Sequence, residues 1–242
     1  MDPWNAQAPL RGTGTLLLAR EAVFYVAFYV LGSSIGWPAS LGLPAHEALP
    51  LIHQNARSVH VGYYLYLVSS LMFVPVVLSL RSTLYGRDPR ANLFLDVAAG
   101  FAVVSAVMRA LGILRWLFAM PALAVLDAAP DIGEHTRAAV HVQFNVLNAY
   151  AGQAGEHLGV QLTGALFVGS LALAFVRLRV QRAFTTWLAF SAVLFLPWGE
   201  YTGVDSGLML FVNGMTFSTW AIVFGLYLIR TGGRRVAGRA AS

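Results

Sequence analysis

Six stretches of about 20 mostly apolar residues follow one another along this chain, and no other feature constrains its fold so strongly. A helix of about 20 residues crosses the hydrocarbon of a bilayer, and lipid offers backbone groups no partners outside helices or closed barrels. The sequence therefore predicts an all-α membrane protein, a bundle of six transmembrane helices in a single domain that covers residues 1–242. The predicted spans are 15–36, 59–80, 93–118, 158–177, 183–203 and 207–229.

The composition supports this class and excludes others. The chain is 57% hydrophobic and only 11% charged, whereas soluble domains carry about 25% charged residues. It has no cysteine, which excludes disulfides and thiolate chemistry. The net charge of +5 comes from arginines at the ends of the spans rather than from one patch, so we expect the lipid bilayer as a partner and no nucleic acid.

The arginines also predict the orientation of the spans. They precede the first span at Arg11 and fill the connections 81–92 and 178–182 and the basic tail 230–242. Their members are Arg81, Arg87, Arg90, Arg177, Arg179, Arg182, Arg230, Arg234, Arg235 and Arg239. The opposite side carries only Arg57 and Arg137. Because basic residues accumulate on the cytoplasmic side, we expect both termini in the cytoplasm.

With this orientation, most polar chemistry falls on the outer face, so we expect a polar site to open outward. The outer loops and outer span ends hold His46, His53, His60, His135, His141, His157, Glu47, Asp127, Asp131, Glu134, Glu156, Glu200 and Asp205. Pro50 predicts a helix start, after which His53, Arg57, His60 and Tyr64 would share one helix face. This stripe either lines a cavity or forms an interfacial belt.

The third predicted span contains an arginine deep in the hydrocarbon. At about 1.5 Å per residue, Arg109 lies roughly 20 Å from the inner end of the span. A buried arginine usually faces the bundle interior and pairs with an acid, and Glu156 is the best candidate. Either the two residues form a structural ion pair, or Arg109 binds an anionic substrate group that Glu156 helps to orient. Arg115 and Trp116 fit an outer interface, with Pro121 ending the helix.

The segment before the fourth span predicts an amphipathic helix on the outer side. One polar face holds His141, Asn145, Asn148, Gly152, Gly155, Glu156, Gly159 and Thr163, and the opposite face holds Tyr150, Gln153, His157 and Gln161. Glu156 and His157 should therefore point to different sides. A helix over 137–177 would be about 60 Å long, so we expect a kink near Gly152–Gly155. The small residues also predict close helix packing at Gly155 and Gly159.

The last two spans add weaker signals. The sequence "LPWGEYTGVDSG" predicts a tight outer turn that carries Glu200, Tyr201 and Asp205. In the sixth span, Asn213, Thr216 and Thr219 are expected to form inter-helix hydrogen bonds.

Three hypotheses for the function remain open. The first is an outward-opening cavity on which the His53–His60 stripe, Arg109 and the His141–Glu156 stripe converge, and which binds or acts on a small or lipid-like ligand. The candidate ligand-binding residues are Arg109, Arg115, Asn145, Asn148, Glu156 and Tyr64, and the catalytic candidates are Glu156, His141 and Arg109. The histidines His53, His60, His141 and His157 are candidate ligands for a divalent metal such as zinc. The second hypothesis is a proton-coupled or small-solute transporter. The third is a non-catalytic membrane sensor or assembly partner.

Two stretches, "RALGILRWLFAMPALA" (109–124) and "FNVLNAYAGQAGEHLG" (144–159), carry a family resemblance. They resemble an uncharacterised family of bacterial integral membrane proteins catalogued as domain of unknown function 4386. The resemblance implies a stand-alone domain in the bacterial cytoplasmic (inner) membrane. It supplies no activity or cofactor, and it marks Arg109, Arg115, Trp116, Asn148, Gly155, Glu156 and His157 as family-like positions. No hydrolase, nucleotide-binding or dinucleotide-binding motif is present in the sequence.

Overall fold

The computed structural model describes residues 10–86, 88–196 and 206–240, and every regular element within these ranges is helical. The α-helices are α1 (Leu10–Ile35), α2 (Ala45–Gln54), α3 (Ala56–Leu71), α4 (Phe73–Leu84), α5 (Pro89–Leu114), α6 (Met120–Asp127), α7 (Glu134–Gln153), α8 (Thr163–Leu178), α9 (Arg182–Leu194) and α11 (Ser206–Ala240). Three tighter or wider helical segments join them: the 3₁₀-helix η1 (Ala39–Gly42) and the π-helices η2 (Arg115–Ala119) and η3 (Ala154–Leu162).

Among the described residues, five helical stretches are long and apolar enough to cross a membrane. They are Leu10–Ile35, Ala56–Leu84, Pro89–Asp127, Glu134–Leu178 and Phe211–Gly233. These stretches match the first four predicted spans and the sixth. The predicted fifth span begins as α9, whose 13 residues cover about 20 Å. Its last part and the predicted turn with Glu200, Tyr201 and Asp205 lie outside the described residues.

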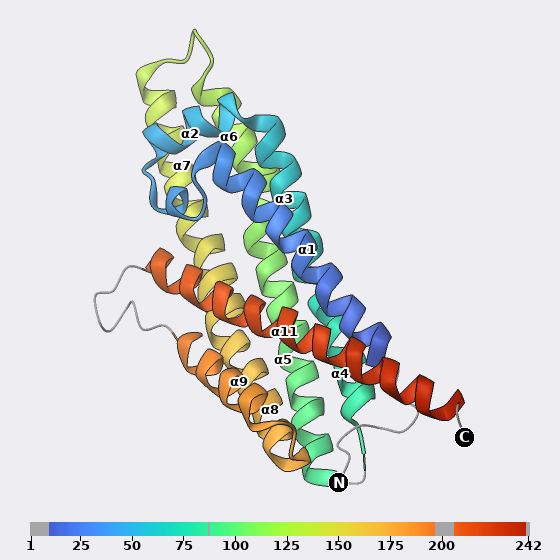
Figure 1. Ribbon diagram of the computed structural model, residues 1–242. Helices are drawn as coiled ribbons and strands as arrows, with labels where there is room; N and C mark the ends of the chain where they lie inside the picture. Colours follow the sequence, from blue (N-terminus) through green and yellow to red (C-terminus); the bar gives the residue numbers. More distant parts are fainter. Residues whose placement is uncertain (1–9, 87, 197–205, 241–242) are drawn as a thin grey trace.

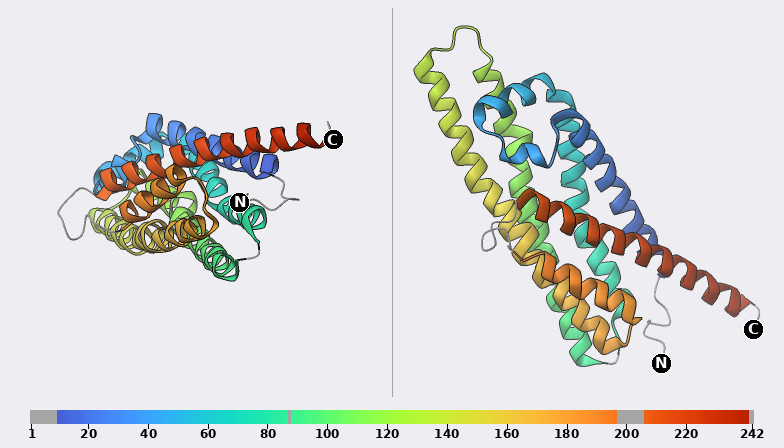
Figure 2. Two further views of the ribbon diagram at one scale, coloured as in Figure 1. Left: turned by 60° about the horizontal axis from the view of Figure 1, so that its bottom comes forward. Right: turned by 60° about the vertical axis from the view of Figure 1, so that its left-hand side comes forward.

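The helices form an elongated bundle whose long passes alternate in direction along the chain (Figure 1). The helices α2, α6 and the first half of α7 gather at one end, and α8, α9 and the first turns of α5 gather at the other (Figures 1 and 2). α11 crosses the bundle obliquely and packs against α1. This crossing is close because neither helix carries a side chain there: a Cβ added at Gly14 would lie 2.5 Å from the carbonyl oxygen of Gly225.

Two apolar cores stabilise the two ends of the bundle. The first is built mainly on α4, α5, α8, α9 and α11, with Phe175, Trp220 and Phe224 among its fully buried side chains. The second joins the end of α1 to α2, α3, η2, α6 and α7, around Tyr63 and Trp116. The buried arginines Arg20, Arg109 and Arg115 line a cavity to which both cores contribute side chains.

The two π-helices lie where the sequence predicted a helix end and a kink. Pro121 does not end the third pass, because the chain widens into η2 just before the proline and then continues as α6 to Asp127. Proline has no N–H group to donate to the preceding turn of an α-helix. A π turn has a different hydrogen-bond spacing, so other N–H groups can pair with those carbonyls. At the position of the predicted kink near Gly152–Gly155, the helix changes to π geometry from Ala154 to Leu162, within one continuous helical stretch over residues 134–178.

Candidate functional site

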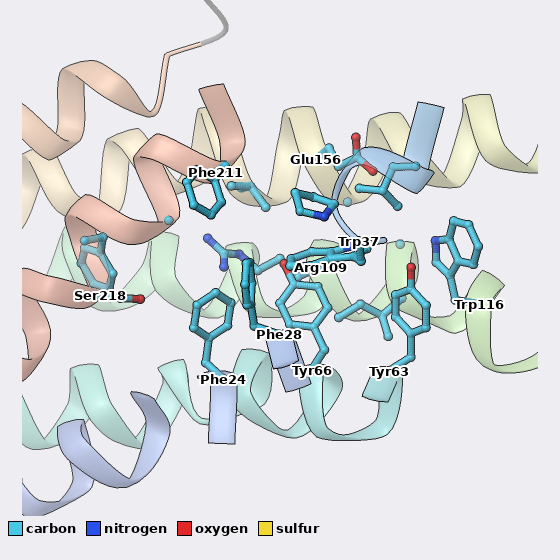
Figure 3. Close-up of a pocket in the computed structure, with 18 of the residues that line it drawn as sticks. Phe24, Phe28, Trp37, Tyr63, Tyr66, Arg109, Trp116, Glu156, Phe211 and Ser218 are labelled. Carbon is cyan, nitrogen blue, oxygen red and sulfur yellow. The ribbon is translucent and has the colours of Figure 1, made fainter. Parts of the chain in front are cut away.

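A cavity lined by aromatic rings lies between the two cores, and we call it the aromatic cavity. It contains about 940 Å³ of empty space, counting the part that is open to the outside. Residues of α1, α3, α4, α5, η2, η3 and α11 line it, and the connection from Trp37 to Leu41 covers one side. Figure 3 shows the aromatic rings around Arg109. The aromatic lining residues are Phe24, Phe28, Trp37, Tyr63, Tyr66, Phe73, Trp116, Phe195, Phe211 and Phe217.

Arg109 reaches this cavity from α5, and its predicted burial is confirmed: it is 8% exposed. Its Nε donates to Ser105 Oγ at 3.2 Å, one helical turn earlier, and lies 3.5 Å from the carbonyl oxygen of Gly159. That carbonyl belongs to η3 and also accepts from Ser105 Oγ and Thr163 Oγ1. No carboxylate of the described residues lies within ion-pair distance of Arg109.

A buried ion pair on α1, which the sequence reasoning missed, lies beside the cavity. Arg20 is 4% exposed and Glu21 is 1% exposed, and Arg20 Nη1 donates to Glu21 Oε1 at 2.5 Å. Adjacent residues on a helix do not normally face each other, so the arginine side chain must bend toward its neighbour. Glu21 Oε2 has no hydrogen-bond partner among the described residues. The signal was available, since both charges interrupt an apolar run.

The ring of Phe73 holds two of the arginines close together. The guanidinium carbon of Arg20 lies 4.2 Å from the ring centroid and that of Arg109 lies 4.7 Å from it. The two guanidinium carbons are therefore at most about 9 Å apart, a separation at which like charges repel by about 2 kcal/mol when the effective dielectric constant is about 20. The cation–π contacts offset part of this repulsion.

Glu156 pairs with Arg115, so the predicted partner Arg109 was wrong. Arg115 Nη2 donates to Glu156 Oε1 at 3.1 Å, with the arginine side chain 5% exposed and the glutamate side chain 33% exposed. Arg115 and Trp116, expected at the outer interface, are both buried in the bundle and line the cavity. The π-helix η2 begins at Arg115, and its wider turn brings Arg115, Trp116 and Leu117 to buried positions. Trp116 stacks on Tyr63 with ring centroids 5.1 Å apart.

The predicted close packing at the glycines is confirmed. A Cβ added at Gly155 would lie 2.9 Å from the Cα of Gly112, and one added at Gly159 would lie 2.8 Å from the backbone nitrogen of Arg109. Gly152 lies beside the Arg115 guanidinium, with 3.0 Å from its Cβ position to Nη1. These glycines let η3 approach α5 closely enough for the Gly159 carbonyl to reach Arg109.

The predicted stripe on the second span does not reach the cavity. Pro50 lies inside α2 rather than at a helix start, and Asn55 separates α2 from α3, so His53 and His60 belong to different helices. His53, Arg57, His60 and Tyr64 are all exposed, and the His60 ring packs edge-on against Tyr64. The neighbouring faces of α3 supply Tyr63 and Tyr66 to the cavity instead.

The remaining candidates from the outer segment are dispersed. His141 Nε2 lies 2.9 Å from Asp127 Oδ1, at the end of α6. Asn145 is exposed, and Asn148 Nδ2 donates to the carbonyl of Leu41 at 3.3 Å, which ties α7 to the covering connection. Glu156 lines the cavity and His157 is not among the lining residues, in agreement with their predicted divergence.

The histidines do not converge with Arg109 and Glu156 as predicted. None of the six lines the aromatic cavity, although His53 lines a second pocket with Asp127 and Arg137. Within the described ranges, no three His, Asp or Glu side chains are grouped to hold a metal ion. On α11, Thr216 and Thr219 bond to carbonyls of their own helix rather than between helices, and Asn213 is buried.

Comparison with known proteins supplies a family. Neither the curated proteins nor the solved structures contain a match to this chain. A family model described as "Domain of unknown function (DUF4386)" matches residues 13–232. This range runs from the first turns of α1 to the last third of α11 and includes every residue that lines the aromatic cavity. The match confirms the resemblance carried by residues 109–124 and 144–159, and the chain belongs to the DUF4386 family.

Proposed function

We propose that this protein binds an amphipathic, lipid-like small molecule in the aromatic cavity. The observation that carries the proposal is a partly open cavity lined by ten aromatic residues and three buried arginines, in a chain built of membrane-length helices. Ligand sites in proteins are typically apolar hollows with a few polar groups that fix the ligand's orientation. Both components are present here.

The proposal includes six crossings with both termini in the cytoplasm. The starts of α1, α5 and α9 and the ends of α4 and α8 carry arginines and lie toward the same end of the bundle (Figure 1), which the positive-inside rule places in the cytoplasm. Because α9 runs opposite to α8 and α11, it supplies the start of the fifth crossing. In this orientation the connection from Trp37 to Leu41 covers the cavity on the outer side.

The depth of the cavity supports a ligand that enters from the membrane or from its outer surface. Arg20 lies ten residues after Leu10, which is about 15 Å along the helix, and Phe28 lies about 12 Å further. The cavity therefore lies within the length of the membrane-length helices rather than beyond their ends. The proposal involves no metal site, because the described residues do not bring His53, His60, His141 or His157 into a group of three metal-ligating side chains.

Filling the cavity tests the proposal. Gly214 lines it, and no described atom lies within 4 Å of a Cβ added there, so Gly214→Phe should occupy ligand space without displacing backbone. Gly100→Phe is the matched control, because Gly100 is also helical and open but is exposed outside the cavity. The probes are two dansyl-labelled undecyl chains, one ending in a carboxylate and one in a hydroxyl. Energy transfer from tryptophan to dansyl reports the bound fraction.

We expect saturable binding of at least one probe to the wild-type protein. Gly214→Phe should weaken that binding at least about tenfold, since a lost ligand contact area of a few rings is worth more than 1.4 kcal/mol. Gly100→Phe should bind like the wild type. Binding that is equal in all three proteins, or absent from all three, contradicts the proposed function.

A further inference from the structure

We propose that the ligand of the aromatic cavity carries one negative charge and that Arg109 binds it. This inference rests on the proposed function and specifies its ligand as a monoanionic amphiphile. The negative group would be a carboxylate or a phosphodiester attached to an apolar body.

The first argument is a charge count. Three guanidinium groups line the cavity, and Glu156 is the only carboxylate among the described lining residues. Glu156 pairs with Arg115, and Glu21, just behind the lining, pairs with Arg20. Within the described ranges Arg109 has no such partner, so the site is short of one negative charge. A buried cation normally has a counter-charge.

The second argument is the position of Arg109 relative to Arg20. The ring of Phe73 keeps their guanidinium carbons within about 9 Å of each other, and Glu21 is the one carboxylate of the described residues that pairs with either of them. An anion at Arg109 would relieve the repulsion between these like charges. Figure 3 shows Arg109 among Phe28, Trp37 and Tyr66, in the middle of the lining rather than at its margin.

The third argument is a shortage of hydrogen-bond acceptors. Tyr63 Oη and Arg115 Nε are buried and have no partner among the described residues. Both residues line the cavity, and both groups can donate. Arg109 donates through Nε alone to Ser105 and Gly159, although a guanidinium has five N–H donors. A carboxylate or phosphodiester supplies only hydrogen-bond acceptors, and these could pair with the unpaired donors of the lining residues.

The aromatic lining argues for the rest of the ligand. Rings of Phe24, Phe28, Phe211 and Phe217 surround the charged groups, and they would contact an apolar chain or ring system rather than a small hydrophilic anion. A hydrated inorganic anion would lose its water here without gaining apolar contacts. The same apolar surroundings strengthen the charge contact, because they lower the local dielectric constant.

The test compares anionic and neutral probes of one length. In the wild-type protein, the dansyl-labelled undecanoate should bind about tenfold to a hundredfold more tightly than the matched alcohol, as expected for one buried charged hydrogen bond. Arg109→Gln should abolish this preference while retaining binding of the alcohol. Arg109→Lys should keep part of it. Arg90→Gln is the matched control, since Arg90 begins the same helix and is exposed, and it should keep the full preference.

Two non-fluorescent competitors then identify the source of the charge. Dodecanoate carries a carboxylate, and dodecyl methyl phosphate carries a phosphodiester like that of a lipid headgroup. Displacement by either one, with dodecanol at least tenfold weaker, supports a monoanionic ligand, and their order separates a free acid from a phospholipid.

Equal affinity of the wild type for acid and alcohol overturns this inference while leaving the proposed function in place. A preference that survives Arg109→Gln overturns the assignment to Arg109. If Arg109→Gln does not fold, Gly214→Phe decides: a preference that persists when the cavity is filled arises elsewhere and overturns the inference. Failure of both probes to bind is the separate outcome that removes the proposed function.

Discussion

The pairing of Glu156 is the most direct quantitative test of the site. A double-mutant cycle compares the unfolding free energies of the wild type, Arg115→Met, Glu156→Met and the double variant. Methionine removes the charge and the hydrogen bond but keeps most of the side-chain volume. A second cycle uses Arg109→Met in place of Arg115→Met. Comparison of the two cycles shows which arginine is coupled to Glu156.

The magnitudes follow from burial and geometry. Arg115 is almost fully buried, and Glu156 is its one hydrogen-bond acceptor among the described residues. Glu156→Met therefore leaves a buried cation unpaired and should cost about 2–4 kcal/mol, near the lower part of the range for broken buried pairs. Arg115→Met should cost less, about 1–2 kcal/mol, because the glutamate side chain is 33% exposed and can bind water when it loses its partner.

The coupling energy should therefore be about 1–2 kcal/mol for Arg115 with Glu156, and below about 0.5 kcal/mol for Arg109 with Glu156. The assay is reversible unfolding in mixed micelles, followed by far-UV circular dichroism. Glu134→Met is the control, since Glu134 lies exposed in the first turn of α7 and should change stability by less than about 0.5 kcal/mol. A larger coupling to Arg109 than to Arg115 would refute the reasoning.

Two further predictions concern packing and topology. Gly112→Ala should destabilise the fold by about 1–3 kcal/mol, because its Cβ would lie 2.8 Å from the Cα of Gly155. Gly100→Ala on the same helix should stabilise the fold by about 0.5–1 kcal/mol. Unfolding in micelles measures both variants, and equal effects would contradict the close contact. Alkaline phosphatase fused after Asp131 should be active, because this position lies on the outer side of the membrane. A fusion after Arg239 should be inactive, because it stays in the cytoplasm. Activity of the Arg239 fusion would mean an odd number of crossings.

Properties that depend only on a helix and its surroundings were predictable from the sequence. Five of the six predicted spans coincide with the five membrane-length helices of the described residues. The depth of Arg109 along its span predicted its burial, and the glycines at 155 and 159 predicted a close helix contact. Each of these conclusions follows from length or residue size and does not require the angular position of a side chain around the helix.

The errors in the predicted polar stripes share a cause, because each stripe depended on an angular position counted at 100° per residue. The break at Asn55 and the π-helices η2 and η3 change that count. The result is that Tyr63 rather than Tyr64 faces the interior, and Arg115 rather than Arg109 meets Glu156. Single π turns leave no clear pattern in composition, so a regular helix is the only basis that the sequence provides.

Glu21 and Arg20 show a different kind of error, since the sequence displays them plainly. Both stand inside the first apolar stretch, and neither fits a connection or a span end. The same reasoning that placed Arg109 in the interior applies to them, and it would have identified the second arginine beside Phe73. Intramembrane charges are more informative than histidines at span ends, because an interfacial histidine is satisfied by water and a buried arginine is not.

The cost of the buried charges is itself an argument for ligand binding. Replacing a buried ion pair with well-packed apolar residues is often neutral or stabilising, so stability alone does not explain why charged residues stand at positions 20, 21, 115 and 156. The described residues nevertheless place five charged groups in or beside one cavity and leave Arg109 without a counter-charge. Two neutral pairs around one unpaired cation form an environment that is polar enough to accept a single anion and too compensated to accept several. Under the proposed function, this arrangement would select the charge of the ligand, and the aromatic lining would select its apolar part.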